Sequence, residues 1–242
     1  MGAVSKLVLV HGFGTSAQVW DRVRGVLDRP ALAPDLPGFG LNTGPEQKDA
    51  NWTVDGMVDA LAGTVRAAGL ESYLLVGHSM GAKVCTVLAA RRPPGLVGLL
   101  LISPSPPTPE PMTETDRERL RAAWNQPERL REQYLGILRQ PLPAACLDDL
   151  VQDGQRASRG AWNAWLDRGH LERREADARR VEVPVRVLGS FDDSVITPSI
   201  IQQGVIPFYR DARLALLHGS GHLLPLELPH EVATAIREAA RG

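Results

Sequence analysis

Tyr73-Leu-Leu-Val-Gly77-His-Ser79-Met-Gly81-Ala-Lys-Val is the stretch of sequence that decides the fold. The apolar run that begins at Tyr73 predicts a buried strand, and the helix-forming residues from Ala82 to Arg91 predict a helix. Between them, glycines stand two residues before and two residues after Ser79, which allows the strand and the helix to approach closely. This G-x-S-x-G pattern predicts a nucleophile elbow that presents the Ser79 hydroxyl at a helix N-terminus.

Strand and helix patterns alternate on both sides of this elbow. Apolar runs predict further strands at Lys6–Val10, Ala31–Pro34, Val97–Ile102, Val185–Leu188 and Leu214–Leu217. Helical spacing of apolar residues predicts helices at Val19–Leu27, Val54–Ala68 and Glu231–Ala240. This alternation predicts an α/β fold with a doubly wound, mostly parallel sheet.

The alternation is interrupted after Ser103 by a proline-rich segment. The following residues, to about Arg180, are charged, poor in strand patterns and helical in character. We therefore expect a helical lid inserted after the strand that follows the elbow helix. The predicted domains are residues 1–108 and 181–242, which form two parts of one α/β core, and residues 109–180, which form the lid.

Composition excludes several classes of function. The 242 residues carry a formal net charge of −1, which argues against a nucleic-acid-binding surface. No apolar stretch is long enough to cross a bilayer, and Met1 to Lys6 leads directly into the first strand without a signal peptide. Two cysteines, Cys85 and Cys146, indicate free thiols in a reducing compartment. We expect a cytoplasmic protein.

A serine nucleophile needs a base, an acid that orients the base, and hydrogen-bond donors for the oxyanion. The C-terminal third supplies candidates for the base and the acid. One predicted strand leads into Gly189-Ser-Phe-Asp192-Asp193, and a later one leads into His218-Gly-Ser-Gly-His222. These two loops predict that the acid and the base follow Ser79 in chain order.

At this point the chain resembles the α/β-hydrolase family, over essentially its whole length. His11-Gly-Phe13-Gly14 resembles the family's oxyanion loop, Asp35-Leu-Pro-Gly-Phe-Gly40 resembles its D-x-P-G-x-G turn, and Gly221-His222 to Pro229 resembles its G-H-x-x-x-x-E-x-P segment. The resemblance implies that Ser79 is the nucleophile and His222 the general base. It also implies that the backbone N–H groups of Phe13 and Met80 form the oxyanion hole.

The family pattern places the triad acid three residues after the glycine that ends its strand, which selects Asp192. Asp193 is the alternative if the loop is shifted by one residue. Among the other histidines, His11 is expected to be structural, and His78 an elbow neighbour that does not act as the base. His218 is the alternative base, although its place at a strand end favours a buried structural role.

Two other functional classes remain. Gly12-Phe-Gly-Thr-Ser-Ala17 fits G-x-G-x-x-A after a strand, with Asp35 at the distance of a ribose-binding acid, so an NAD-dependent oxidoreductase is one alternative. That alternative leaves the elbow and His222 unexplained. A non-catalytic receptor with a hydrolase fold is the other, although such proteins tend to lose a triad residue and none is missing here.

The sequence therefore predicts a cofactor-independent serine esterase that forms an acyl-enzyme on Ser79. The same triad serves C–C bond hydrolases, thioesterases, acyltransferases and lyases, which stay open as alternatives. Trp124, Trp162 and Trp165 are candidate walls of a pocket for a small, partly apolar ester. No histidine or cysteine pair has metal-ligand spacing, so we expect no metal. The net charge and the absence of a long apolar stretch lead us to expect no nucleic-acid and no membrane partner. The sequence does not indicate the oligomeric state.

Overall fold

The segments predicted as strands form one parallel sheet in the computed structural model, which describes residues 6–43 and 52–241. Residues 1–5, on which the expectation of no signal peptide rests, lie outside the described residues. The strands are β1 (Lys6–Val10), β2 (Ala31–Leu32), β3 (Tyr73–His78), β4 (Leu96–Ile102), β5 (Val185–Ser190) and β6 (Ala212–Leu217). Their order in the sheet is β2-β1-β3-β4-β5-β6, with parallel pairing throughout.

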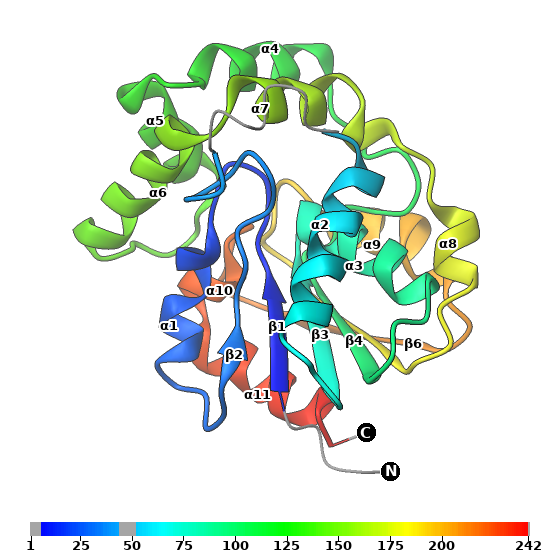
Figure 1. Ribbon diagram of the computed structural model, residues 1–242. Helices are drawn as coiled ribbons and strands as arrows, with labels where there is room; N and C mark the ends of the chain where they lie inside the picture. The colour runs from blue at the N-terminus through cyan, green and yellow to red at the C-terminus, as the bar shows by residue number, and fades with distance from the viewer. Residues whose placement is uncertain (1–5, 44–51, 242) are drawn as a thin grey trace.

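Helices cover both faces of this sheet (Figure 1). On one face α2 (Val54–Ala67) packs against α3 (Met80–Ala90), and on the other α1 (Asp21–Arg24) contacts α11 (Pro229–Ala239). The remaining helices of the core are α9 (Pro198–Gly204), α10 (Leu224–Glu227) and the 3-10 helices η1 (Ala17–Trp20) and η4 (Ile206–Phe208). The predicted doubly wound α/β fold is confirmed.

The insertion between β4 and β5 is helical, as expected. It contains α4 (Glu114–Ala123), α5 (Pro127–Ile137), α6 (Ala144–Arg156), α7 (Arg159–Asp167), the 3-10 helix η3 (Gly169–Leu171) and α8 (Glu175–Arg179). Figure 1 shows α4 to α7 lying across the carboxyl ends of the strands, where ligands bind in open α/β sheets. We call this insertion the lid; its boundaries at residues 109 and 180 stay a prediction.

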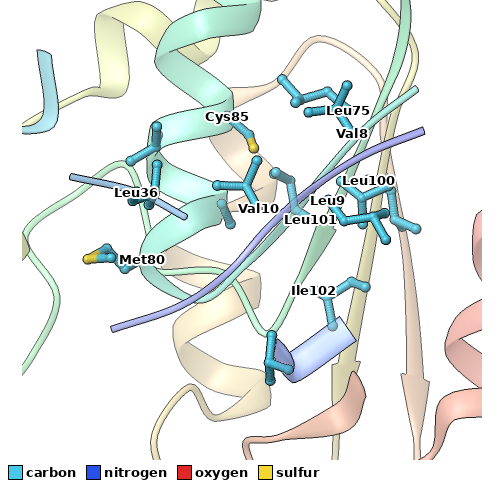
Figure 2. Packing of buried hydrophobic residues seen from close by; sticks show 14 of the residues in the cluster. Val8, Leu9, Val10, Leu36, Leu75, Met80, Cys85, Leu100, Leu101 and Ile102 are labelled. Atoms are coloured by element: carbon cyan, nitrogen blue, oxygen red, sulfur yellow. The ribbon is translucent and has the colours of Figure 1, made fainter. Parts of the chain in front are cut away.

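The hydrophobic core covers both faces of the sheet, and one part of it lies between the sheet and α3. Val8 and Val10 of β1, Leu75 of β3 and Cys85 of α3 are fully buried, and Figure 2 shows them in one cluster. Every residue of α3 is buried, so the helix that follows Ser79 is held on all sides. A helix held in this way gives the elbow a rigid support.

Local chemistry explains where elements differ from the prediction. The segment predicted as one helix from Val19 is a 3-10 turn followed by the short α1. The edge strand β2 is limited to two residues because Pro30 precedes it and Pro34 follows closely, and proline cannot donate to a sheet. Within the described ranges no helix combines the length and the apolar character needed to span a membrane.

Candidate active site

The predicted elbow is formed by Ser79, which connects the end of β3 directly to the start of α3. Its backbone has φ 51° and ψ −120°, a left-handed conformation that is strained for a serine. A Cβ atom on Gly77 would lie 2.6 Å from the Ala82 Cα, and one on Gly81 would lie 2.3 Å from the His11 carbonyl oxygen. Only glycine fits at either position, which explains the spacing of the motif.

A chain of hydrogen bonds runs from Ser79 through His222 to Asp193. The Ser79 Oγ lies 2.9 Å from the His222 Nε2, and the His222 Nδ1 lies 2.9 Å from the Asp193 Oδ2. A carboxylate only accepts, so the Nδ1–H donates to Asp193 and the Nε2 is left to accept the Ser79 hydroxyl proton. The three side chains follow β3, β6 and β5, whose parallel carboxyl ends share one edge of the sheet.

The contact with His222 that we expected for Asp192 is made by Asp193. The strand β5 continues one residue beyond Gly189, and the Asp193 Oδ1 accepts hydrogen bonds from the N–H groups of Val195 (2.8 Å) and Ile196 (3.0 Å). This local turn leaves the second oxygen of Asp193 facing His222. Asp193, the alternative weighed in the sequence, is thus the carboxylate that contacts His222.

The neighbouring carboxylate has a different environment. The Asp192 Oδ2 accepts a hydrogen bond from the Gly219 N–H at 2.7 Å, and its side chain is partly exposed. His218 lies beside it, 78% exposed and stacked on Phe191, so the expected buried role for His218 is wrong. Asp192, in the loop after β5, and His218, in the loop after β6, therefore both lie toward the solvent and outside the triad.

The electrostatics of the buried pair favour a charged carboxylate and a basic imidazole. Burial alone raises the pKa of Asp193, but the charge and hydrogen bond of His222 and two backbone N–H groups outweigh it, and the pKa is lowered. Burial alone lowers the pKa of His222, but Asp193 outweighs it, with smaller contributions from Glu110 and Glu227, and the pKa is raised. His222 is thus equipped to accept a proton.

His78 holds the backbone of His222. Burial, followed by the charge of His222, lowers the pKa of His78 to about 3, so this imidazole is neutral. Its Nε2–H donates to the His222 carbonyl oxygen at 2.9 Å. His78 therefore positions the loop that carries His222. The base that contacts the Ser79 hydroxyl is His222 and not His78.

The loop that carries Phe13 is fixed by hydrogen bonds to the Gly12 carbonyl oxygen. This oxygen accepts from the Thr15 Oγ1 at 3.1 Å and from the His11 Nδ1 at 2.8 Å, while the His11 Nε2 accepts from the Leu36 N–H at 2.9 Å. The Gly12 carbonyl and the Phe13 N–H belong to the same peptide plane, so these bonds fix the direction of that N–H. The structural role expected for His11 follows from this geometry.

The second predicted oxyanion donor belongs to the first residue of α3. As the first residue of α3, Met80 has a backbone N–H without an acceptor in its own helix, which leaves this group available to a ligand. A Cβ atom on Gly12 would lie 3.1 Å from the Ser79 Cβ, so the loop before Phe13 packs directly against the elbow. Both predicted donors thus border Ser79.

The lid supports the loop of Phe13 at three points that sequence reasoning missed. The Tyr134 hydroxyl donates to the Gly14 carbonyl oxygen at 2.6 Å, and the Ser16 hydroxyl donates to the Asp153 carboxylate at 2.6 Å. The Trp162 ring centroid lies 4.4 Å from that of Phe13. Tyr134 and Asp153 follow their partners by 120 and 137 residues, so no local signal in the sequence could pair them.

The three tryptophans proposed as pocket walls pack within the protein. The indole N–H groups of Trp162 and Trp124 donate to the carbonyl oxygens of Leu120 and Ala157. Trp165 is buried beneath the ammonium group of Lys83. None of the three lines the cavity between the lid and the loop after β5, because their rings are engaged in packing of the lid.

A cavity of about 600 Å³ lies between the lid and the loop after β5. Its lining includes Glu110, Ile137 and Val195, while Ser79 and His222 are not part of it. It nevertheless adjoins them, because the Ile137 carbonyl oxygen accepts from the His222 N–H at 2.8 Å and the Val195 N–H donates to Asp193. This is the space beside the triad in which a substrate group can lie.

The dinucleotide-binding alternative does not fit the local structure. Asp35, its candidate ribose acid, accepts hydrogen bonds from the N–H groups of Ala17 and Leu41. The glycine-rich loop leads into the four-residue η1 and not into the long helix whose N-terminus would bind a pyrophosphate. Asp35 therefore holds two loops together.

Comparison with known proteins agrees with this architecture. A sequence profile described as the alpha/beta hydrolase family matches residues 7–235. The structure of the esterase EaEST from Exiguobacterium antarcticum superposes with a TM-score of 0.87 at 15% identity, covering 100% of this chain and 94% of the esterase. At that identity the likeness shows the fold alone.

Two curated relatives have different chemistry. Lipase LipV of Mycobacterium tuberculosis is 34% identical over 102 residues, which cover 42% of this chain and 38% of the lipase. The 2-succinyl-6-hydroxy-2,4-cyclohexadiene-1-carboxylate synthase of an Enterobacter species is 28% identical over 97% of this chain and 91% of the synthase. The chain thus spans well under half of the lipase but nearly all of the synthase.

Proposed function

The chain belongs to the alpha/beta hydrolase family, and from this premise we propose that it is a serine hydrolase that cleaves a carboxylic ester through an acyl-enzyme on Ser79. The observation that carries the proposal is the hydrogen-bond chain Ser79–His222–Asp193, with both links at 2.9 Å. A nucleophile within reach of a base that is itself oriented by a buried acid is the arrangement that acyl transfer requires.

In the proposed acylation step, the Ser79 oxygen attacks the acyl carbon while the His222 Nε2 takes the hydroxyl proton. Asp193 stabilises the resulting imidazolium and holds its orientation. The N–H groups of Phe13 and Met80 donate to the oxyanion of the tetrahedral intermediate. When the ester bond breaks, His222 returns the proton to the leaving alcohol.

Deacylation repeats these steps with water in place of the serine hydroxyl. His222 takes a proton from the water, the hydroxide attacks the acyl carbon, and the proton then returns to the Ser79 oxygen as the acid leaves. Every proton in this cycle passes through His222, so the proposed mechanism needs no cofactor. A small-molecule ester with a partly apolar acyl or alcohol group is the proposed substrate.

Lyase chemistry on the same triad is the second candidate. One relative that this chain matches over almost its whole length is a synthase, whereas the similarity to the lipase is confined to less than half of the chain. Thioesterase, acyltransferase and C–C hydrolase activities use the same nucleophile and base. The unpaired Cys85 and Cys146 support the further proposal of a cytoplasmic location.

The test combines p-nitrophenyl ester hydrolysis across acyl lengths with fluorophosphonate labelling, the modified residue being located by mass spectrometry. We expect turnover and a label on Ser79, with turnover reduced on the order of a thousandfold or more in Ser79→Ala and His222→Ala. His218→Ala is the matched control, since this exposed histidine lies outside the triad. Label on Ser79 without ester turnover would favour lyase or C–C chemistry, and near-full activity of Ser79→Ala would refute the mechanism.

A further inference from the structure

Glu110 lines the cavity, and its carboxylate has no hydrogen-bond or ion-pair partner among the described residues. Only 8% of the residue is exposed, and it lines the cavity beside the triad. Its backbone is fixed, because its N–H donates to the His170 carbonyl at 2.8 Å and its carbonyl accepts from the Met112 N–H at 2.9 Å. Across residues 6–43 and 52–241, however, the side-chain oxygens form no hydrogen bond or ion pair.

Lys83 and the two arginines of the cavity wall are engaged elsewhere. The Lys83 ammonium group donates to the carbonyl oxygens of Thr108, His170 and Glu172 at 3.2 to 3.4 Å, so its three donors are used. In the cavity wall, Arg119 pairs with Asp116 at 3.0 Å, and Arg129 donates to a backbone carbonyl. None of these groups neutralises Glu110 through a direct contact.

A carboxylate in the wall of a cavity can accept a hydrogen bond from a ligand, and a ligand that supplies a positive charge or an N–H donor gains a charge-assisted hydrogen bond there. The position of Glu110 also matters, because its negative charge contributes to the raised pKa of His222, which places this carboxylate near the triad. An anionic group placed beside Glu110 would instead face a like charge, which Lys83 compensates only at a distance and not by a direct contact.

We propose that Glu110 is a specificity-determining residue, which selects esters carrying a protonated amine on the part of the substrate that fills the cavity, and which disfavours anionic esters. The proposal deepens the proposed esterase function and rests on it. Glu110 acts in this proposal by direct contact with the substrate ammonium group, an N⁺–H donating to a carboxylate oxygen.

The test compares esters that differ only in charge. The first pair is 2-(dimethylamino)ethyl butanoate and its neutral isostere 3-methylbutyl butanoate; the second pair, which moves the charge to the acyl side, is methyl 4-(dimethylamino)butanoate and methyl 5-methylhexanoate. The ratio of kcat/KM within each pair is measured at pH 7 by titration of the released acid. We expect at least one ratio to favour the cation by about tenfold or more, and Glu110→Gln to abolish that preference.

Glu132→Gln is the matched control. Glu132 lines the same cavity, but its side chain is exposed, so solvent screens its charge. We expect this variant to keep the parent ratio within about twofold. A parent enzyme without cation preference in either pair, or a preference that survives in Glu110→Gln, would overturn the proposal.

A binding measurement separates this proposal from the esterase function. Ligand-observed NMR with N,N-dimethylhexylamine, protonated at pH 7, and with hexanoate reports on the cavity without any turnover. We expect the ammonium ion to bind more tightly than hexanoate, and Glu110→Gln to remove the difference. If no ester is hydrolysed but this difference is found, the esterase proposal fails, whereas recognition of an ammonium group by Glu110 stands for a substrate of another class. Equal binding of both ions to the parent protein refutes that recognition.

Discussion

Replacing Asp193 by asparagine should invert the hydrogen bonds of His222. The N–H groups of Val195 and Ile196 need an acceptor, so the asparagine oxygen will stay on them, as the Asp193 Oδ1 does now at 2.8 and 3.0 Å. The amide NH2 group then faces the His222 Nδ1, which has to accept instead of donate. The proton moves to the Nε2, which can no longer take a proton from Ser79.

The expected loss follows from this change of tautomer. The variant keeps its shape but loses both the base and the charge that stabilises the imidazolium, so kcat should fall on the order of 10⁴-fold, about 5.5 kcal/mol in the barrier. The assay is steady-state hydrolysis of a p-nitrophenyl ester, with NMR of the His222 ring nitrogens to report the tautomer directly and circular dichroism to report the fold.

Asp192→Asn is the matched control, one residue away. Asp192 accepts a single hydrogen bond from the Gly219 N–H, which an asparagine oxygen can also accept, so we expect less than about a tenfold change in kcat. The assignment of Asp193 would be refuted by a loss in Asp192→Asn as large as in Asp193→Asn. It would equally be refuted if Asp193→Asn kept a tenth or more of the parent kcat.

Three further outcomes follow. Asp193 raises the pKa of His222, so in Asp193→Asn the acidic limb of the pH profile of kcat/KM should move to lower pH; an unmoved limb contradicts this. Tyr134→Phe removes the 2.6 Å bond to the Gly14 carbonyl, so kcat should fall about tenfold with KM within about twofold, whereas a change confined to KM argues against a role in the oxyanion loop. Burial raises the pKa of Asp153 from 3.8 to about 6, so the folded protein favours the protonated, neutral carboxyl group. The stability that this preference contributes is present below pH 4 and is lost as the pH rises through 6. Asp153→Asn should therefore increase the free energy of unfolding in urea by up to about 3 kcal/mol at pH 8 and change it little at pH 4; equal effects at both pH values contradict this.

The lid contacts connect substrate binding to the oxyanion loop. Tyr134, Asp153 and Trp162 come from α5, α6 and α7, and each contacts one residue of the loop between Phe13 and Ser16. A movement of the lid would therefore alter the support of the predicted oxyanion donor. Of these three helices, α5 also contributes to the wall of the cavity, so this part of the lid borders both the cavity and the oxyanion loop.

Much of the fold could be predicted because its signals are local. Buried parallel strands are continuous apolar runs, and β3 and the elbow were recognisable from a few adjacent residues. The glycine spacing around Ser79 has a direct steric cause, namely contacts of 2.3 and 2.6 Å that any Cβ atom would make. The candidate nucleophile and base could be named because short motifs around Ser79 and His222 resemble those of the family.

Only the tertiary structure decided which of Asp192 and Asp193 contacts His222. It also decided whether the lid tryptophans line the cavity or pack within the protein. Adjacent carboxylates carry the same chemistry, and the direction of each depends on where β5 ends and on the turn that Val195 and Ile196 close. The exposed placement of His218, the packing of the tryptophans and the unpartnered carboxylate of Glu110 depend in the same way on residues distant in sequence. Sequence by itself determined which reactive groups are present and roughly which loops carry them, because those signals arise from neighbouring residues. Which of these groups face one another was decided by long-range packing, since side-chain directions are set by contacts that no local pattern encodes.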